Sequence, residues 1–290
     1  MPHAGAGLVS LWAFVDGDYL PQERATIPVM DRGLLLGDGI FETVRVKRGT
    51  PEYFREHFDR FCASAGAVRI RQPWSRESLE EICAEVCRRS GLEDASVRIT
   101  LTRGAYRGTL SDTKDPPRLI ATCAPADRTD PRIYSEGVAV AIAGAPRVHE
   151  LPPSIKATQY LAAVLARLEA DDQGCYETLF LDRRDRVLEL SSATFFAARG
   201  GRILTPPLRL GILAGVTRSA VLRLAKSARI PAGESVLRRD DLAGIDEAFL
   251  TSAVRGVVPV VRLGGASVGD GRPGPLTRRV MDLFRSETGR

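Results

Sequence analysis

Closely spaced short strands in the second half of the chain place the strongest constraint on its fold. This region consists of short apolar runs separated by turn-forming residues such as Gly200 and Gly201. The expected strands are Glu177–Asp182, Val187–Leu190, Thr194–Ala198 and Arg202–Thr205. Several short strands at this spacing predict a curled sheet or barrel.

The first half mixes helices with strands. The run Tyr53–Ala65 carries aromatic residues at helical spacing, and we expect Gly66 to be its C-cap. We expect Ser75 to cap the N-terminus of a second amphipathic helix, which ends at Gly91. Alternating residues predict strands at Ile40–Val46, Ser96–Thr102 and Arg118–Cys123.

A polar, proline-bearing stretch, Pro125–Tyr134, separates the two halves and predicts an interdomain linker. A length of 290 residues suits one large or two medium domains. We therefore expect an α+β fold with a smaller N-terminal α/β domain and a larger, strand-rich C-terminal domain. The expected boundaries are 1–125 for the N-terminal domain, 126–136 for the linker and 137–290 for the C-terminal domain.

Composition excludes several classes of protein. Hydrophobic residues make up 44% and charged residues 27%, as in an ordinary globular protein. We find neither a membrane-spanning run nor a signal pattern, so we expect a cytoplasmic protein without membrane partners. The five cysteines form no CxxC pair, and the three histidines lack metal-ligand spacing, so we expect no metal. The net charge of +5 comes from dispersed arginines, which disfavours nucleic-acid binding and suits an enzyme that handles phosphate or carboxylate groups.

The first candidate for chemistry is Lys156, which precedes an apolar stretch with helical spacing. We expect Thr158 to be the N-cap of this helix. Its apolar positions, which predict a stripe facing a core, are Tyr160, Leu161, Val164, Leu165 and Leu168. Lysine is usually solvated, and a solvated residue at a helix start is the simpler interpretation. A partly buried lysine, however, loses its proton more readily and can form a Schiff base.

Three other features suit an anion or a heteroaromatic ring. Arg60 lies beside the aromatic stripe of its helix, as either an amphipathic side chain at a core edge or an anion clamp. The sequence Gly215-Val216-Thr217 opens a helix, where exposed N–H groups bind phosphate. Glu189 stands among apolar neighbours, and a buried acid needs a partner. The protonated nitrogen of a pyridine ring would serve as that partner.

Together, and in their order along the chain, these motifs resemble those of the class IV, or fold type IV, pyridoxal-phosphate-dependent aminotransferases. This family includes branched-chain aminotransferases, D-amino-acid aminotransferases and aminodeoxychorismate lyases. The resemblance extends from about Asp31 to about Val260. It implies a C-terminal pseudo-barrel domain that carries the Schiff-base lysine, a pyridoxal 5'-phosphate cofactor, and a homodimer in which loops of one subunit close the other's site.

The resemblance also implies roles for individual residues. Lys156 is similar to the Schiff-base lysine, Arg60 to the cofactor-phosphate arginine and Glu189 to the glutamate that faces the pyridine nitrogen. The remaining cofactor-binding positions implied by the resemblance are Tyr160 near the ring hydroxyl, Leu213 against the ring, Val216 and Thr217 at the phosphate helix, and Ser252 and Ala253 in a turn that reaches the phosphate.

The substrate is less constrained. Leu34 occupies the place of a tyrosine that D-amino-acid aminotransferases share, and their Arg-x-His carboxylate clamp is missing. Leu34 and Leu36 predict an apolar pocket for a hydrophobic side chain. Either Arg107 or Arg255 is expected to bind the substrate carboxylate, since the planar guanidinium suits it. A surface loop charge is the alternative interpretation for both.

We therefore expect a transaminase that uses a Lys156 aldimine. It would move an amino group between an amino acid, hydrophobic and branched-chain-like or of D configuration, and a 2-oxo acid. The alternative is an aminodeoxychorismate lyase, which yields 4-aminobenzoate and pyruvate. A basic binding module without catalysis is disfavoured because the lysine, arginine and glutamate matches are all present.

Overall fold

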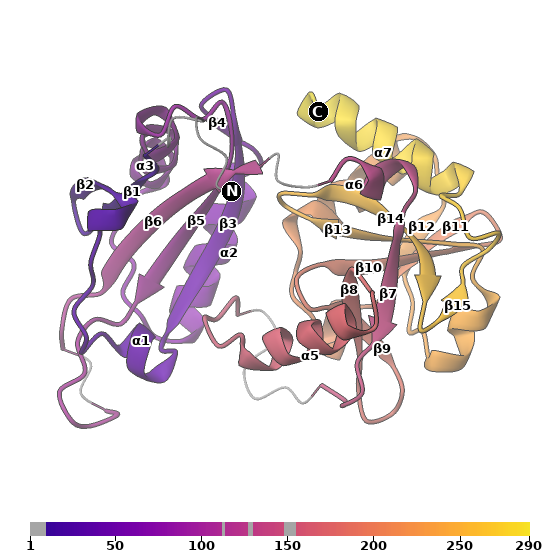
Figure 1. The fold of residues 1–290 in the computed structure, drawn as a ribbon, viewed down its shortest axis with the longest axis horizontal. Coiled ribbons are helices and arrows are strands. Elements are labelled where there is room, and N and C mark those ends of the chain that lie inside the picture. The colour runs from indigo at the N-terminus through magenta and orange to yellow at the C-terminus, as the bar shows by residue number, and fades with distance from the viewer. Residues whose placement is uncertain (1–9, 112–113, 127–129, 148–154) are drawn as a thin grey trace, which may run out of the picture. The chain divides into compact units, whose positions relative to one another are not determined.

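The computed structural model describes residues 10–111, 114–126, 130–147 and 155–290. It divides into two compact units, each with its own sheet and helices (Figure 1). The first unit contains the chain up to residue 128 together with Lys156–Thr158, and the second contains 129–155 and 159–290. The mixture of helices and strands confirms the predicted α+β class.

The first unit is built on an antiparallel six-stranded sheet in the order β2-β1-β6-β5-β3-β4. The strands are β1 (Trp12–Val15), β2 (Asp18–Pro21), β3 (Gly39–Lys47), β4 (Thr50–Pro51), β5 (Asp94–Thr102) and β6 (Arg118–Pro125). The helices are α1 (Arg32–Leu36), α2 (Phe54–Ala67) and α3 (Arg76–Arg89), and a short 3-10 helix covers Gln22–Arg24. Helix α2 packs on β3, and α3 packs on β1 and β6. The contact between α2 and β3 positions several residues of the site below.

Helix ends follow the expected capping rules in part. The Ser75 hydroxyl accepts a hydrogen bond from the N–H of Ser78, which confirms it as the N-cap of α3. The expectation that Gly66 is the C-cap of α2 was wrong, because the helix continues to Ala67. The left-handed residue that follows this helix is Arg69, with φ of 56°, so glycine alone does not mark the end.

The second unit contains a nine-stranded sheet in the order β12-β11-β10-β13-β14-β7-β8-β9, with β15 paired to β14. The strands are β7 (Val138–Ile142), β8 (Glu177–Leu181), β9 (Val187–Leu190), β10 (Thr194–Arg199), β11 (Arg202–Thr205), β12 (Ala232–Glu234), β13 (Glu247–Ser252), β14 (Gly256–Leu263) and β15 (Ala266–Ser267). The helices are α4 (Arg132–Ser135), α5 (Leu161–Asp172), α6 (Val216–Ser227) and α7 (Pro275–Thr288), with 3-10 helices at Leu208–Leu210 and Arg239–Gly244. The four strands expected from the sequence are all present within one residue of their predicted ends.

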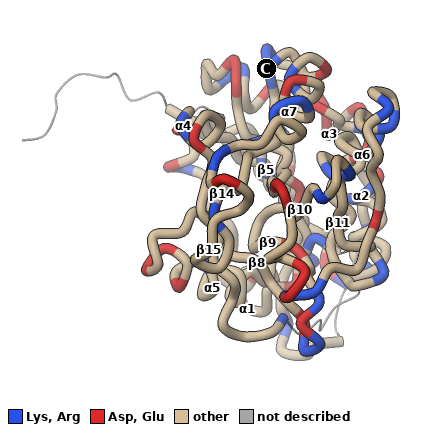
Figure 2. The backbone as a smooth tube through the Cα atoms, turned by 90° about the vertical axis from the view of Figure 1, so that its right-hand side faces the viewer, with Lys and Arg blue, Asp and Glu red and all other residues tan. Residues whose placement is uncertain are grey.

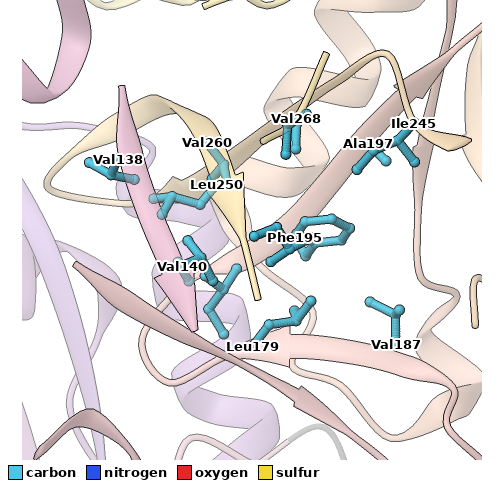
Figure 3. Packing of buried hydrophobic residues seen from close by; sticks show 14 of the residues in the cluster. Val138, Val140, Leu179, Val187, Phe195, Ala197, Ile245, Leu250, Val260 and Val268 are labelled. Carbon is cyan, nitrogen blue, oxygen red and sulfur yellow. The ribbon is translucent and has the colours of Figure 1, made fainter. Parts of the chain in front are cut away.

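A large apolar core holds this sheet together (Figure 3). Alternate residues of its strands supply the side chains, among them Val140, Leu179, Phe195, Leu250 and Val260. The neighbours of Phe195 on β10 and of Leu250 on β13 point to the opposite face, where Phe196 and Phe249 stack with ring centroids 4.8 Å apart. Strands that bury both faces explain why this half of the sequence is so apolar.

Helix α5 differs most from the sequence expectation. It begins at Leu161 with Tyr160 as N-cap, so the prediction of Thr158 as N-cap was wrong. The four aliphatic side chains of the expected core stripe are exposed, with Leu161 at 72% and Leu165 at 54%, while Tyr160 is half-buried. The buried side of α5 is formed instead by Ala166 and Ala170, because small residues let the helix approach the sheet closely.

Charges are interspersed along the chain, as Figure 2 shows by the alternation of blue and red segments. Among the described residues, every helix is too short or too polar to cross a lipid bilayer.

Candidate active site

Lys156 lies in a short extended segment beside the start of β3. The N–H of Phe41 donates to the Lys156 carbonyl at 2.9 Å, and the N–H of Thr158 donates to the Gly39 carbonyl at 3.0 Å. The Thr158 hydroxyl donates to the Gly37 carbonyl at 2.8 Å. These bonds explain why Thr158 does not cap α5 and why Lys156–Thr158 group with the first unit.

A glycine is required where this segment meets β3. A Cβ placed on Gly39 would lie 2.9 Å from the Leu101 carbonyl oxygen and 3.4 Å from the Thr158 side chain. A larger residue would therefore clash with the β5 backbone at Leu101 and tighten the contact with Thr158.

The Lys156 side chain is half-buried and lies against the ring of Phe41. Its Nζ is 4.4 Å from the ring centroid. The guanidinium carbon of Arg98 lies 3.6 Å from the same centroid, so two cations face one phenyl ring. Sequence reasoning missed both Phe41 and Arg98. Strand alternation, which puts Phe41 on the face opposite Glu42, was the signal available for Phe41.

Arg60 lies on α2 in the same unit. It forms a two-bond ion pair with the carboxylate of Glu42 on β3. Ser64, one helical turn after Arg60, accepts a hydrogen bond from the Lys156 N–H at 3.3 Å. The structure thus places the backbone of the expected Schiff-base lysine against α2, one helical turn from the expected phosphate arginine.

In the second unit, Glu189 lies on β9 and is buried. Its carboxylate accepts hydrogen bonds from the Arg147 guanidinium and, at 3.1 Å, from the N–H of Leu213. Arg147 in turn lies over the ring of Phe180. The chain therefore supplies Glu189 with a cationic partner of its own, which the sequence did not predict.

Helix α6 begins at Val216 after Gly215, and no side chain of the described residues caps this end. A Cβ on Gly215 would lie 2.8 Å from the Thr194 hydroxyl oxygen. Thr194 pairs across the sheet with Thr251, so both side chains share the face that meets the helix N-terminus.

The same location contains a polar group that lacks a partner. Thr251 is 2% exposed, and its hydroxyl makes no hydrogen bond to the described residues. Thr217, in the first turn of α6, is also buried. Uncapped N–H groups and an unsatisfied hydroxyl are the donors that a phosphate group requires, so these residues fit it.

Arg255 and Ser252 belong to a partly buried network in the second unit. Arg255 donates to the Ser252 hydroxyl at 3.0 Å and to the Ser192 hydroxyl at 2.8 Å. Its guanidinium is also 3.5 Å from the fully buried carboxylate of Glu177. Ser191 and Ser192 donate to the same carboxylate. Arg255 thus already has an anionic partner within the chain.

The other substrate candidates lie in the first unit. Arg107 makes a bidentate ion pair with Asp115, at 2.6 Å for each bond, and its side chain is 63% exposed. Leu34 is 61% exposed in α1, and Leu36 is half-buried at the end of that helix. Asp31 caps α1 by accepting from the N–H of Gly33 at 2.8 Å.

The fold and these residues define a class of protein, the aminotransferases of class IV. The family described as "Amino-transferase class IV" matches residues 39–263 of this chain. Because the match covers most of the sequence, the chain belongs to this family and has its fold type IV architecture. Class IV aminotransferases depend on pyridoxal phosphate, so this protein is a pyridoxal-phosphate enzyme.

Curated relatives cover nearly the whole chain. A putative branched-chain-amino-acid aminotransferase of Methanocaldococcus jannaschii is 31% identical over 275 residues, which cover 94% of each protein. A D-alanine aminotransferase of Listeria monocytogenes is 30% identical over 278 residues, again covering 94% of each.

Solved structures agree with this assignment. A branched-chain amino acid aminotransferase of Escherichia coli superposes with a TM-score of 0.90 at 27% identity, covering 97% of this chain and 94% of that one. A branched-chain amino acid aminotransferase of Thermoproteus uzoniensis with norvaline gives a TM-score of 0.88 at 28% identity, covering 95% and 94%. A 4-amino-4-deoxychorismate lyase of Pseudomonas aeruginosa gives 0.81 at 29% identity, covering 95% and 98%.

Proposed function

We propose that this aminotransferase moves an amino group between a hydrophobic, branched-chain-like or D-amino acid and a 2-oxo acid, with the Lys156 amine as the group that binds the cofactor. One observation carries the proposal. The Nζ of Lys156 lies over Phe41, while the Lys156 backbone is bonded to the helix that holds Arg60. An amine and an anion-binding guanidinium in one neighbourhood suit the two ends of a phosphorylated aldehyde.

Other residues of the site are proposed to hold the phosphate and the ring of the cofactor. Arg60, Val216, Thr217, Ser252 and Ala253 are proposed to bind the phosphate. When bound, the cofactor supplies the electron sink for cleavage of the substrate's α-C–H bond. The Nζ of Lys156 would act as the base that takes the α-proton of the substrate.

The ring of the cofactor is proposed to contact three further residues. Glu189 would face the ring nitrogen and favour its protonated form, while the Arg147 and Leu213 contacts hold the carboxylate in place. Leu213 would pack on the ring, and Tyr160, the N-cap of α5, would lie near the ring hydroxyl. All three belong to the second unit.

The replacement Lys156→Ala tests the central assignment. We expect it to abolish both turnover and the visible absorbance of the protein-bound cofactor, because no other amine replaces Nζ. Lys226→Ala, on the exposed side of α6, is the matched control and should behave like the wild type. Normal turnover by the Lys156 variant would contradict the proposal.

The substrate carboxylate is proposed to bind Arg107 or Arg255. Arg107 can exchange its exposed bond to Asp115 for a substrate at small cost, since exposed ion pairs contribute little. Arg255 is held more firmly by Ser252 and Glu177. Arg98 is a third candidate because it faces the ring that lies against Lys156.

Steady-state kinetics of alanine variants distinguishes these arginines. Removing the carboxylate partner should raise KM for the amino acid at least tenfold while cofactor binding stays unchanged, because a charge-assisted bidentate pair is lost. If neither Arg107→Ala nor Arg255→Ala raises KM, that assignment is wrong and Arg98→Ala is the variant to measure next.

A lyase reaction is the second candidate, supported by the similarity to the Pseudomonas aeruginosa 4-amino-4-deoxychorismate lyase. A panel of L- and D-amino acids with 2-oxoglutarate or pyruvate as acceptor tests the two candidates. New amino acid formed from the acceptor supports the transaminase. Formation of 4-aminobenzoate and pyruvate from aminodeoxychorismate, with no transamination, supports the lyase.

We also propose that the protein is a homodimer. The outer face of α5 presents Leu161, Val164, Leu165 and Leu168, which are all exposed in the single chain. Exposed aliphatic faces of this kind mark interaction sites. A second copy of the chain is the proposed partner, in agreement with the dimeric organisation that the family resemblance implies.

A further inference from the structure

A buried cluster of three ionisable side chains lies between β3 and α2 in the first unit. Glu42 comes from the strand, and His57 and Arg60 come from one face of the helix, three residues apart. The side chains are 1%, 3% and 11% exposed in that order. Charged groups at such depth require close partners.

The Glu42 carboxylate uses both of its oxygens. Arg60 donates from Nε to Oε1 at 2.8 Å and from Nη2 to Oε2 at 2.7 Å. The Nδ1 of His57 lies 2.8 Å from Oε2 and donates to it, since an ionised carboxylate only accepts. Two parallel bonds fix the plane of a guanidinium as well as its position.

The charges around Glu42 favour the same ion pair as the hydrogen-bond geometry does. Burial alone would raise the pKa of Glu42, but Arg60 and His57 outweigh it and lower the pKa to about 2. Glu42 is therefore ionised at neutral pH, and the ion pair with Arg60 persists there. An arginine side chain otherwise has many rotamers to lose when it binds an anion.

We propose that Glu42 is a positioning residue for the cofactor site, which with His57 holds the Arg60 guanidinium in the orientation that binds the cofactor's phosphate. The inference rests on the proposed role of Arg60. It adds that the affinity for the phosphate depends on a carboxylate, although a carboxylate and a phosphate repel each other.

Because of this repulsion, the direction in which the phosphate affinity changes when Glu42 is replaced distinguishes two possible roles of Glu42. If Glu42 acted only through its charge, removing that charge would leave Arg60 more attractive to a phosphate, and binding would tighten. If Glu42 acts by positioning, its removal frees the guanidinium to rotate, and phosphate binding weakens.

The test compares two aldehydes on the apoenzyme: pyridoxal 5'-phosphate and pyridoxal, which lacks the phosphate. Dissociation constants are measured by absorbance for the wild type, Glu42→Gln and Glu42→Asp. We expect both variants to bind pyridoxal phosphate at least tenfold more weakly and pyridoxal as the wild type does. Glu42→Asp keeps the charge but shortens the side chain, so it separates position from charge and covers a failure of Glu42→Gln to fold.

The replacement Asp94→Asn is the matched control. Asp94 on β5 pairs with Arg45 on β3, the strand that also carries Glu42, so this variant loses an ion pair without touching Arg60. It should leave both dissociation constants unchanged. A His57→Gln variant should give a smaller loss of phosphate-specific affinity than the Glu42 variants. It weakens only the hydrogen bond from His57 to Glu42 and leaves the two bonds from Arg60 to Glu42 in place.

Other outcomes overturn the inference. Unchanged or tighter binding of pyridoxal phosphate by the Glu42 variants would show that Glu42 does not position Arg60, and so would equal weakening of both aldehydes, which indicates general damage. A wild type that binds the phosphorylated aldehyde no better than pyridoxal would instead contradict the proposed role of Arg60 itself.

Discussion

At the scale of single residues, the charged side chains that suggest chemistry in the sequence mostly have partners within the chain. Arg60 pairs with Glu42, Glu189 with Arg147, and Arg107 with Asp115. A buried charge is stable only when it is paired and hydrogen-bonded. Such partners therefore show which charges the fold can hold in place for a ligand, and they cannot be found from the position of one residue in the sequence.

The acid sensitivity of the protein should reflect Glu42. Its pKa is about 2 when folded against an ordinary value of 4.5, so as pH falls the unfolded chain takes up the proton first. The stabilisation is complete above pH 4.5 and is lost between there and about pH 2. This one group contributes about 3 kcal/mol over that range.

Urea unfolding of the apoenzyme at several pH values checks this expectation. The free energy of unfolding of Glu42→Gln should be lower than that of the wild type at neutral pH and should fall less steeply below pH 4.5. Parallel curves for the two proteins would show that Glu42 is not held in its ionised form by the fold.

At the scale of elements, the N-termini of α6 and α7 show how helix ends are assigned to different tasks. The α7 N-terminus is satisfied within the chain, because Glu247 accepts from the N–H groups of Leu276 at 3.0 Å and Thr277 at 2.7 Å. The α6 N-terminus follows a glycine and has no such cap among the described residues. The N-terminus of α7 therefore contributes to stability, and the N-terminus of α6 fits a bound anion.

Glu247→Ala should therefore lower stability without affecting the cofactor. Loss of a side-chain cap costs about 1–2 kcal/mol, and Glu247 lies at the opposite end of β13 from Ser252. Chemical denaturation measures the stability, and titration with pyridoxal phosphate measures the affinity. Asp270→Ala, which removes an exposed turn acceptor for the N–H of Arg272, is the control and should change neither. A weaker affinity in the Glu247 variant would contradict this division of tasks.

At the scale of the whole molecule, the outward-facing aliphatic residues of α5 are a feature that the packing of a single chain does not explain. Its small residues face the sheet while its large aliphatic residues face outward. Burial of a leucine side chain stabilises a protein by about 2 kcal/mol. Four aliphatic residues exposed in one row would therefore contribute a large stabilising free energy if another surface covered them.

The double replacement Leu161→Glu and Leu165→Glu tests whether a second copy covers them. We expect the wild type to elute as a dimer and the variant as a monomer, because charges on this face oppose its burial. Light scattering coupled to size exclusion gives the masses, and circular dichroism should be unchanged since both side chains are exposed. Leu208→Glu, on a 3-10 helix and 37% exposed, is the control. A variant that remains dimeric would show that α5 is not the interface.

Sequence patterns alone predicted most of the longer strands, the start of α3, the α+β class and the family. These depend on local periodicity, on capping residues such as Ser75 and on motifs that survive in order along the chain. Sequence reasoning also named Lys156, Arg60 and Glu189, because each is an unusual residue type for its local pattern.

Only the tertiary structure decided which face of α5 is buried and which side chains pair. Periodicity shows that a helix has an apolar stripe, but whether leucines or alanines meet the sheet depends on how closely the backbones approach. Likewise, Glu42 stands 18 positions before Arg60, and only the packing of α2 on β3 brings the carboxylate to the guanidinium.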